Sequence, residues 1–308
     1  MRMSRKAFPW VLGALLVSGL AALEHHFEFL DSAALLLQSA PGSQVTTPTL
    51  ALPLKDKSVR FGIIGDNGTG EVAQYQVADV MASMRAKFPF EFVLMLGDNI
   101  YGSKSDAAFK RKFETPYKAL LDSGVKFYAS LGNHDDPNEI YYKPFNMGGK
   151  RYYNFKVANA EFFALDSTYM DPTQLQWIES KLQASTAMWK ICYFHHPLYS
   201  DGKFHGPDVD LRSKLEPLLI KNQVRAVFNG HEHVYERIKA QNDIAYFVLG
   251  NSGQLRRNNL KPTAIMAKGF DTDQAFMIAE ISENELSFQT ISRAGQTVDS
   301  GVLTIAIK

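Results

Sequence analysis

Metal-capable side chains follow five apolar runs along this chain of 308 residues. They are carboxylates, an amide and imidazoles: Asp66, Asp98, Asn133, His195, His231 and His233. Such a set suits borderline divalent or trivalent metals better than calcium, and it is too large for one tetrahedral zinc. Hydrolases hold two ions about 3.5–4 Å apart for in-line displacement at phosphorus. Asp98 is our candidate for a carboxylate that bridges two such ions.

Each of these side chains has an ordinary structural role when it is taken alone. An Asp or Asn after a strand is usually a turn residue or a helix cap, and a lone His is usually a satisfied polar group. The repetition of the pattern after five apolar runs favours a common site instead.

The apolar runs that must position these side chains are short and rich in strand-forming residues. They cover residues 59–65, 92–97, 127–132, 191–194 and 224–230. The sequence predicts helices at 71–87, 106–122, 173–182 and 209–219. In α/β folds, ligands collect outside the carboxyl ends of the strands, so five such ends would converge on one polar site.

The two halves of the chain differ in their predicted strands. The first half reads as β-α-β-α-β, whereas the aromatic-rich runs at 152–155 and 161–165 suit antiparallel strands. Later runs at 244–249, 274–281, 285–291 and 302–307 are mostly strand-like. We therefore expect an α/β fold in which two sheets face each other.

The composition indicates a globular protein without a basic or acidic bias. Of its residues, 45% are hydrophobic, and 33 basic residues balance 32 acidic ones. Nothing in this balance predicts binding to nucleic acid or to an anionic membrane surface. Cys192 is the single cysteine, so an intramolecular disulfide is excluded, and we interpret it as a buried small hydrophobic residue.

The first 57 residues differ from the rest of the chain. Residues 1–23 combine basic positions with an apolar stretch, which is typical of an export signal; the alternative is an uncleaved anchor. Residues 24–57 are expected to form a linker and residues 58–308 the catalytic domain. In either case we expect the catalytic domain outside the cytoplasm, either exported (secreted or periplasmic) or membrane-anchored.

Five ordered motifs together resemble the purple acid phosphatases, small animal tartrate-resistant type, within the calcineurin-like metallophosphoesterases. They are Asp66-x-Gly68, Gly97-Asp98-x-x-Tyr101, Gly132-Asn133-His134-Asp135, His195-x-Pro197 and Gly230-His231-x-His233. The resemblance implies a four-layer α/β/β/α sandwich of two mixed sheets. Most metallophosphoesterases have a His at the position of Gly68, and the purple acid phosphatases instead provide a tyrosine at the position of Tyr101.

The resemblance also implies a ligand assignment. Fe(III) would bind Asp66, Tyr101 and His233, and a divalent Fe, Zn or Mn ion would bind Asn133, His195 and His231. Asp98 would be shared by both ions. The alternative for Tyr101 is an aromatic side chain that packs at a strand end. The absence of a His at the position of Gly68 favours the ligand role.

Two further histidines match catalytic positions of the family. His134 resembles the phosphate-contacting His, and His205 resembles the His of a His-Gly-Pro motif, with slightly different spacing. Their alternative roles are stabilisation of a loop for His134 and an ordinary exposed position for His205.

The function that the resemblance implies is acid phosphatase activity on small phosphate monoesters, by in-line attack of a metal-bound hydroxide. The alternatives are a phosphodiesterase or nucleotide hydrolase of the same superfamily, and a noncatalytic metal-binding scaffold. The oligomeric state stays open at this stage, and a membrane partner is expected only if the N-terminal segment is an uncleaved anchor.

Overall fold

The computed structural model describes residues 48–306. The predicted signal or anchor at 1–23 and most of the predicted linker at 24–57 lie outside the described residues. Within 48–306, no helix has the length and apolar character needed to cross a membrane.

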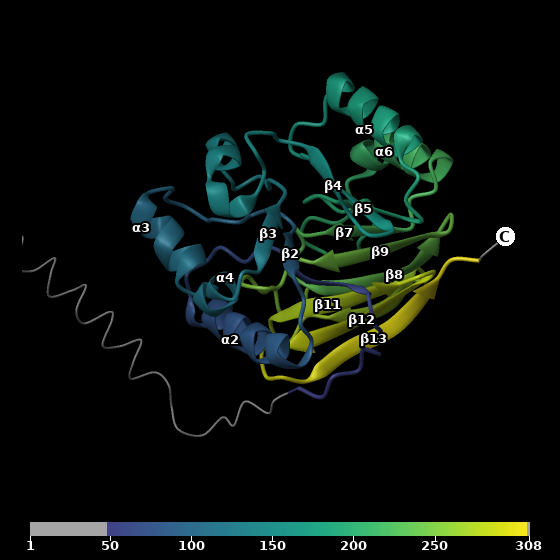
Figure 1. Cartoon of the computed structure of the whole chain (residues 1–308). Coiled ribbons are helices and arrows are strands. Elements are labelled where there is room, and N and C mark those ends of the chain that lie inside the picture. The colour runs from purple at the N-terminus through teal and green to yellow at the C-terminus, as the bar shows by residue number, and fades with distance from the viewer. Residues whose placement is uncertain (1–47, 307–308) are drawn as a thin grey trace, which may run out of the picture. The chain divides into compact units, whose positions relative to one another are not determined.

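Two mixed sheets form the centre of the domain (Figure 1). The first has the order β13-β12-β11-β1-β2-β3 and consists of β1 (Val59–Ile64), β2 (Phe92–Met95), β3 (Lys126–Ala129), β11 (Ala275–Ser282), β12 (Glu285–Ser292) and β13 (Thr297–Thr304). The second has the order β10-β8-β9-β7-β6-β5-β4 and consists of β4 (Tyr153–Val157), β5 (Ala160–Ala164), β6 (Trp189–Tyr193), β7 (Ala226–Asn229), β8 (Tyr235–Gln241), β9 (Ile244–Leu249) and β10 (Met266–Phe270).

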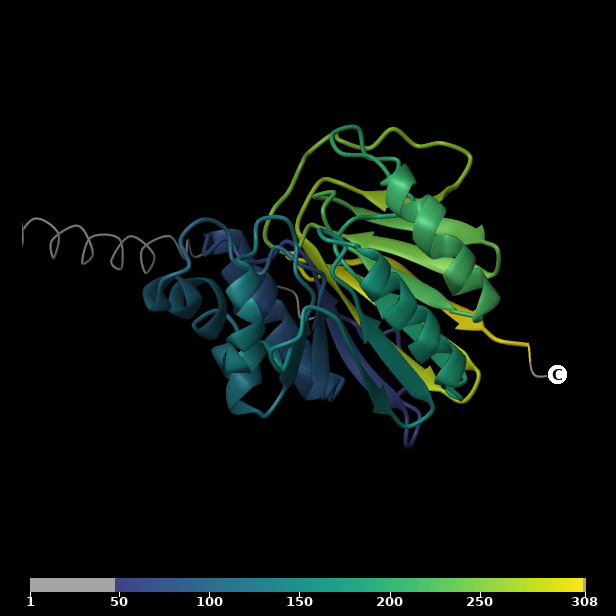
Figure 2. The ribbon, with the colours of Figure 1, turned by 90° about the horizontal axis from the view of Figure 1, so that it is seen from above.

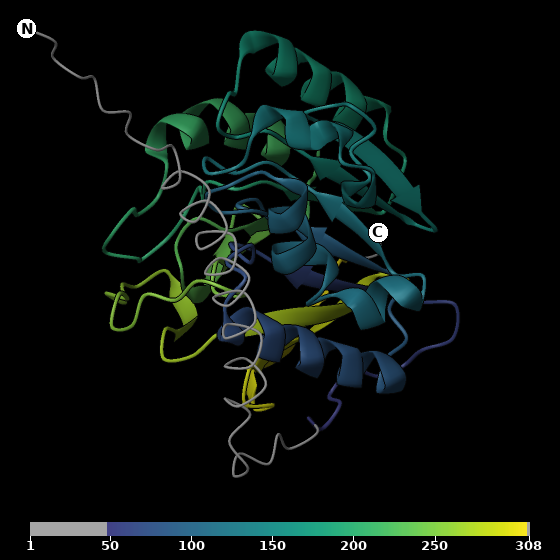
Figure 3. The same ribbon diagram turned by 90° about the vertical axis from the view of Figure 1, so that its left-hand side faces the viewer.

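Helices cover the outer face of each sheet (Figures 1 and 3). On the first sheet lie α2 (Val72–Lys87), α3 (Asp106–Phe109) and α4 (Lys118–Asp122), and on the second lie α5 (Pro172–Ala184) and α6 (Val209–Lys221). Short turns of helix also occur at Lys110–Glu114, Pro137–Tyr141 and Lys143–Phe145. The predicted α/β fold of two facing sheets with outer helices is therefore confirmed.

The single helix predicted over residues 106–122 is wrong. α3 continues into a π-helical turn at Lys110–Glu114, where Thr115 N–H donates to the Lys110 carbonyl, and α4 starts only at Lys118. Pro116 explains the break, because proline lacks an N–H and its ring clashes with the carbonyl four residues earlier.

The alternation of side chains along the strands separates two hydrophobic cores. In β6, Ile191 and Tyr193 belong to the core between the sheets, whereas Cys192 belongs to the core beneath α5 and α6. β5 divides in the same way, with Phe162 in one core and Phe163 in the other. A period of two places successive side chains on opposite faces of a strand, so each central strand supplies both cores. The buried position predicted for Cys192 is confirmed, and burial raises the pKa of its thiol.

Aromatic rings join the two sheets. Phe61 in β1 and Phe92 in β2 contact Phe162 in β5 edge to face, with ring centroids 5.2 and 5.3 Å apart. These contacts hold β1 and β2 against the second sheet. Residues 48–57 also pack on the first sheet, where Leu52 is buried and Ala51 N–H donates to the Gln289 side chain at 2.8 Å.

Candidate metal centre

The predicted metal ligands lie together where strands from both sheets end. Asp66 follows β1, Asp98 follows β2, His195 follows β6, and His231 follows β7. β1 and β2 are parallel to each other, as are β6 and β7, so within each sheet these strands end at the same edge. The structure brings all seven predicted ligands into one continuous set of contacts.

The first half of this set consists of Asp66, Tyr101 and His233. The Tyr101 hydroxyl donates to Asp66 Oδ1 at 3.1 Å and lies 3.3 Å from His233 Nε2. His233 Nε2 is also 3.3 Å from Asp66 Oδ1. One ligand atom each from Asp66, Asp98 and His233 lies within 4.8 Å of the others, and all three residues are buried. This spacing fits a single cation.

The second half consists of Asn133, His195 and His231. His195 Nε2 lies 3.0 Å from Asn133 Oδ1, 3.1 Å from His231 Nδ1 and 3.5 Å from Asp98 Oδ1. Asp98 therefore belongs to both halves, since its carboxylate also takes part in the first.

The tautomer of His195 determines which of its ring nitrogens can bind a metal ion in this second half. Its Nδ1 lies 2.9 Å from the Leu96 carbonyl oxygen, which can only accept, so Nδ1 carries the proton and Nε2 presents a lone pair. That lone pair faces the side-chain amide of Asn133, whose Oδ1 lies 3.0 Å away, and a cation at this position would accept a lone pair from both atoms. The donor set thus fits a second metal ion, with a backbone carbonyl orienting the imidazole.

The titration behaviour of these groups agrees with a site built for cations. Burial, together with the nearby charge of Asp98, raises the pKa of Asp66 well above its usual range. Burial lowers the pKa of His195 and His231, and it lowers that of His233 to about 4, with Arg256 contributing. The imidazoles are therefore neutral and able to bind metal, while buried carboxylates lack a compensating positive charge.

Ionisation of the Tyr101 phenol also depends on a nearby cation. Burial raises the pKa of its phenol, and the charges of Asp66 and Asp98 raise it further. A tyrosinate at this position would require a strong positive charge beside it, which a trivalent ion provides.

The backbone at three predicted ligands is strained. Asp66 and Asp98 both have φ of 53°, and His231 has φ of 70°, values that non-glycine residues adopt rarely. Such strain persists where surrounding contacts impose it, and it concentrates at functional sites. Here the Asp66 carboxylate accepts the His231 N–H at 2.9 Å, which joins a loop of the first sheet to a loop of the second.

Two glycines are required by close approach rather than by loop flexibility. A Cβ on Gly230 would meet the Asp66 carboxylate, so this position leaves room for no side chain. A Cβ on Gly68 would meet the backbone carbonyl of Asn99, so no histidine fits there. Tyr101 N–H donates to the Gly68 carbonyl at 2.9 Å, and thus the residue at the position of the absent histidine holds the tyrosine in place.

The structure places both predicted catalytic histidines at the exposed rim of the site. His134 N–H donates to Asp98 Oδ1 at 2.9 Å, and its ring centroid is 5.0 Å from that of Tyr101. The ring of His205 lies 4.0 Å from that of His231 and 6.3 Å from that of His233. Burial lowers the pKa of His205 even though much of the residue is exposed.

Two carboxylates that were not predicted as site residues hold the loops of the site in place. The buried Asp135 carboxylate accepts from the N–H groups of Asn99, Ile100 and Gly132 and from the Asn99 side chain, at 2.7–3.1 Å. Buried Glu232 accepts from the N–H groups of His205 and Gly206 at 2.5 and 2.7 Å. Both carboxylates lie beside predicted ligands in the sequence, which could have indicated a role in the site. Most of the groups that donate to them, however, lie far away along the chain.

His196 is a further neighbour of the site. Its ring centroid lies 4.4 Å from that of His231, and its Nδ1 is 2.9 Å from the Ser167 hydroxyl. Burial lowers its pKa.

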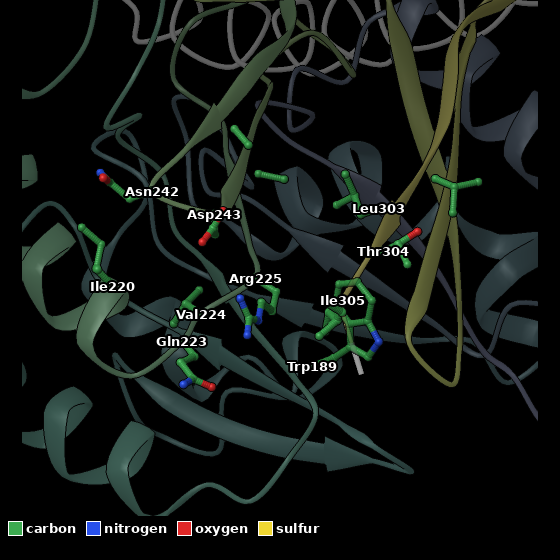
Figure 4. Close-up of a pocket in the computed structure, with 14 residues that line it drawn as sticks. Trp189, Ile220, Gln223, Val224, Arg225, Asn242, Asp243, Leu303, Thr304 and Ile305 are labelled. Atoms are coloured by element: carbon green, nitrogen blue, oxygen red, sulfur yellow. The ribbon is translucent and has the colours of Figure 1, made fainter. Parts of the chain in front are cut away.

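A pocket of about 650 Å³ lies elsewhere, at the opposite ends of the strands (Figure 4). Trp189 at the start of β6, Arg225 before β7 and Asp243 between β8 and β9 contribute to its wall. It contains none of the predicted ligands.

Comparisons with known proteins agree with this geometry. The family model described as calcineurin-like phosphoesterase matches residues 59–235. Purple acid phosphatase 4 of Arabidopsis thaliana is 31% identical over 293 residues, which cover 82% of this chain and 86% of that protein. Tartrate-resistant acid phosphatase type 5 of Sus scrofa is 26% identical over 317 residues, which cover 86% of this chain and 92% of that protein.

Solved structures share the fold. GAP50, the anchor in the inner membrane complex of Plasmodium, aligns with a TM-score of 0.71 at 20% identity and covers 82% of this chain and 90% of its own. A purple acid phosphatase from yellow lupin (Lupinus luteus) seeds aligns with a TM-score of 0.67 at 18% identity, over 80% of this chain and 54% of its own.

Proposed function

This chain belongs to the calcineurin-like phosphoesterase family and is a phosphoester hydrolase, and we propose that it is a binuclear acid phosphatase that acts on phosphate monoesters. The observation that carries the proposal is the position of Asp98. Its carboxylate lies in the group with Asp66 and His233 and is also 3.5 Å from His195 Nε2.

The residues that would hold the two ions divide by contact. Asp66, Tyr101 and His233 would hold Fe(III), Asn133, His195 and His231 would hold a divalent Fe, Zn or Mn ion, and Asp98 would be shared. When bound, the ions supply Lewis acidity at the phosphoryl oxygens and lower the pKa of the attacking water. The tyrosine favours Fe(III) at the first position, because its phenol needs a strongly charged neighbour to ionise.

The chain itself positions the phosphate monoester. His134 lies at the exposed rim, and its backbone is tied to Asp98, so its ring can donate to a phosphoryl oxygen. His205 lies over His231 on another side of the site, where its imidazolium can protonate the departing alkoxide. The lowered pKa of His205 makes the imidazolium available only in acid, which agrees with an acid phosphatase.

Metal content and a visible spectrum test the metal assignment. We expect two metals per chain and a broad visible band in the wild type, and loss of the band in Tyr101→Phe, which removes the phenolate but retains the ring. The exposed Tyr141→Phe substitution is the control and should leave the band unchanged. Two metals without a visible band in oxidised wild-type protein would contradict the ferric tyrosinate.

Turnover of phenyl phosphate, diphenyl phosphate and nucleotides tests the reaction. We expect the monoester phenyl phosphate to be hydrolysed with a higher kcat/KM than diphenyl phosphate. A preference for the diester would instead identify a phosphodiesterase, and no turnover with both metals bound would indicate a binding scaffold.

A further inference from the structure

Two loops join to form one wall of the candidate metal centre. The loop before α6 and the loop between β9 and β10 are connected by an antiparallel bridge between Gly202 and Leu260. Lys203 N–H also donates to the Asn259 carbonyl at 2.9 Å, and Lys261 N–H donates to the Asp201 carbonyl at the same distance. Figure 2 shows these loops, green and yellow-green, side by side at the top of the view. The wall is therefore a hydrogen-bonded unit rather than two independent loops.

The wall is anchored to the metal-ligand segment. Glu232, between His231 and His233, accepts from His205 N–H in one loop and from the Asn259 side chain in the other, the latter at 2.7 Å. Arg256 N–H donates to the His233 carbonyl at 2.9 Å. Both loops are thus positioned relative to the ligands by hydrogen bonds to the Glu232 side chain and to the His233 backbone.

Arg256 presents an unpaired positive charge in this wall. Its guanidinium lies over the ring of Phe204, 3.3 Å from the centroid. Within residues 48–306 its side chain forms neither an ion pair nor a hydrogen bond, and its Nε is buried without a partner. A partly buried guanidinium whose terminal nitrogens have no partner is a strong binding group for an oxyanion.

The position of this charge suggests which part of a substrate it meets. Phe204 is 60% exposed, and its ring contacts that of His205, with centroids 4.6 Å apart. His205 is the residue proposed above to protonate the leaving group. Arg256 and Phe204 therefore lie on the leaving-group side of the site, next to His205.

We propose that Arg256, stacked on Phe204, forms a subsite for a leaving group that bears its own negative charge, as the second phosphoryl group of a pyrophosphate linkage does. This inference rests on the proposed function for the direction of the leaving group. The subsite is specificity-determining, since it contacts the part of the substrate that departs. It strengthens binding of substrates whose leaving group is charged and leaves binding of esters of neutral alcohols unchanged.

Binding of two non-hydrolysable probes tests the subsite without relying on turnover. Methylenediphosphonate carries the second anionic group and methylphosphonate lacks it. By calorimetry on the metal-loaded protein, we expect Arg256→Gln to weaken binding of the diphosphonate about 10- to 100-fold and that of the monophosphonate less than about 3-fold. Arg257→Gln is the matched control, because the exposed Arg257 donates to the Thr272 backbone carbonyl and should not affect either probe.

Kinetics with pyrophosphate and phenyl phosphate provide the second measurement. Arg256→Gln should reduce kcat/KM for pyrophosphate selectively, whereas Arg256→Lys, which keeps the charge but loses the planar fork, should retain part of it. Equal losses for both substrates in Arg256→Gln, or no loss for either, would overturn the subsite. So would equal binding of the two phosphonates by the wild type.

The outcomes separate this inference from the proposed function. A wild type that hydrolyses neither substrate but binds the diphosphonate through Arg256 would overturn the phosphatase proposal and leave the subsite standing. Active enzyme whose substrate preference is unaltered in Arg256→Gln would overturn the subsite and leave the phosphatase proposal standing. If Arg256→Gln proves unstable, Phe204→Leu provides a second variant, because it keeps the guanidinium and removes the ring on which it stacks. It should show a smaller selective loss of diphosphonate binding.

Discussion

At the scale of single residues, the two histidines of the rim face different parts of the site, and we therefore propose different tasks for them. His134 is tied to Asp98 through its backbone, next to Tyr101, whereas His205 stacks on His231 beside the wall that contains Phe204. The first position suits a donor to the phosphoryl group, and the second suits a proton donor to the leaving group.

This division predicts how His205→Ala depends on the substrate. A poor leaving group such as the alkoxide of glycerol phosphate needs a proton in the transition state, whereas nitrophenolate does not. We expect His205→Ala to reduce kcat at least about 10-fold more for glycerol phosphate than for nitrophenyl phosphate, which steady-state kinetics will measure. His134→Ala is the comparison and should slow both substrates alike; equal effects of His205→Ala on the two substrates would contradict its role.

At the scale of the elements, β8 carries a buried carboxylate that links it to the loop before α6. Glu236 accepts from the Ser200 hydroxyl at 2.5 Å and from Asp201 N–H at 2.7 Å. Burial raises its pKa from 4.5 to about 7. The folded state therefore binds a proton that the unfolded state has lost between these two pH values.

This shift predicts an effect of pH on stability. Because the pKa of Glu236 is higher in the folded than in the unfolded state, its contribution to the free energy of unfolding is largest below pH 4.5 and decreases as the pH rises to about 7. Glu236→Gln removes the ionisation, so Tm should decrease less between pH 4.5 and 7 in this variant than in the wild type. Thermal unfolding of the apo protein at several pH values measures this, with exposed Glu283→Gln as control; parallel curves for wild type and Glu236→Gln would contradict the prediction.

At the scale of the whole domain, the candidate metal centre joins the two sheets. Asp66 and Asp98 come from the first sheet, and His195, His231 and His233 come from the second. Burial of carboxylates beside each other destabilises the protein without a cation, as the raised pKa of Asp66 indicates. Metal binding should therefore hold the sheets together as well as serve catalysis.

Metal removal tests this coupling. A ligand present at 100 times its Kd stabilises the folded state by about 2.7 kcal/mol, so chelation of tightly bound metal should lower Tm by several degrees. Asp98→Asn should lose most of this metal-dependent difference and may be compared with Asp122→Asn, an exposed substitution that should retain it. The same Tm for wild type with and without metal would show that the site does not couple the sheets.

Local patterns in the sequence predicted the strand ends, the candidate ligands and helices at 71–87, 173–182 and 209–219. The structure has these helices at Val72–Lys87, Pro172–Ala184 and Val209–Lys221. These follow from short-range chemistry: the period of side chains, the apolar runs and the residue types that can bind metal. Only the tertiary structure decided which side chains meet across the sheets. The contacts of Asp66 with His231 and of Glu232 with Asn259 depend on how the strands are ordered in space.

The differences from expectation have two origins. Pro116 interrupts the predicted helix at 106–122 through local sterics, so the sequence contained this signal and the prediction of a single helix overlooked it. Arg256 shows the contrast most clearly. Its charge is evident from the sequence, whereas its lack of a partner and its stacking on Phe204, 52 residues earlier in the chain, arise only because two loops form a single wall.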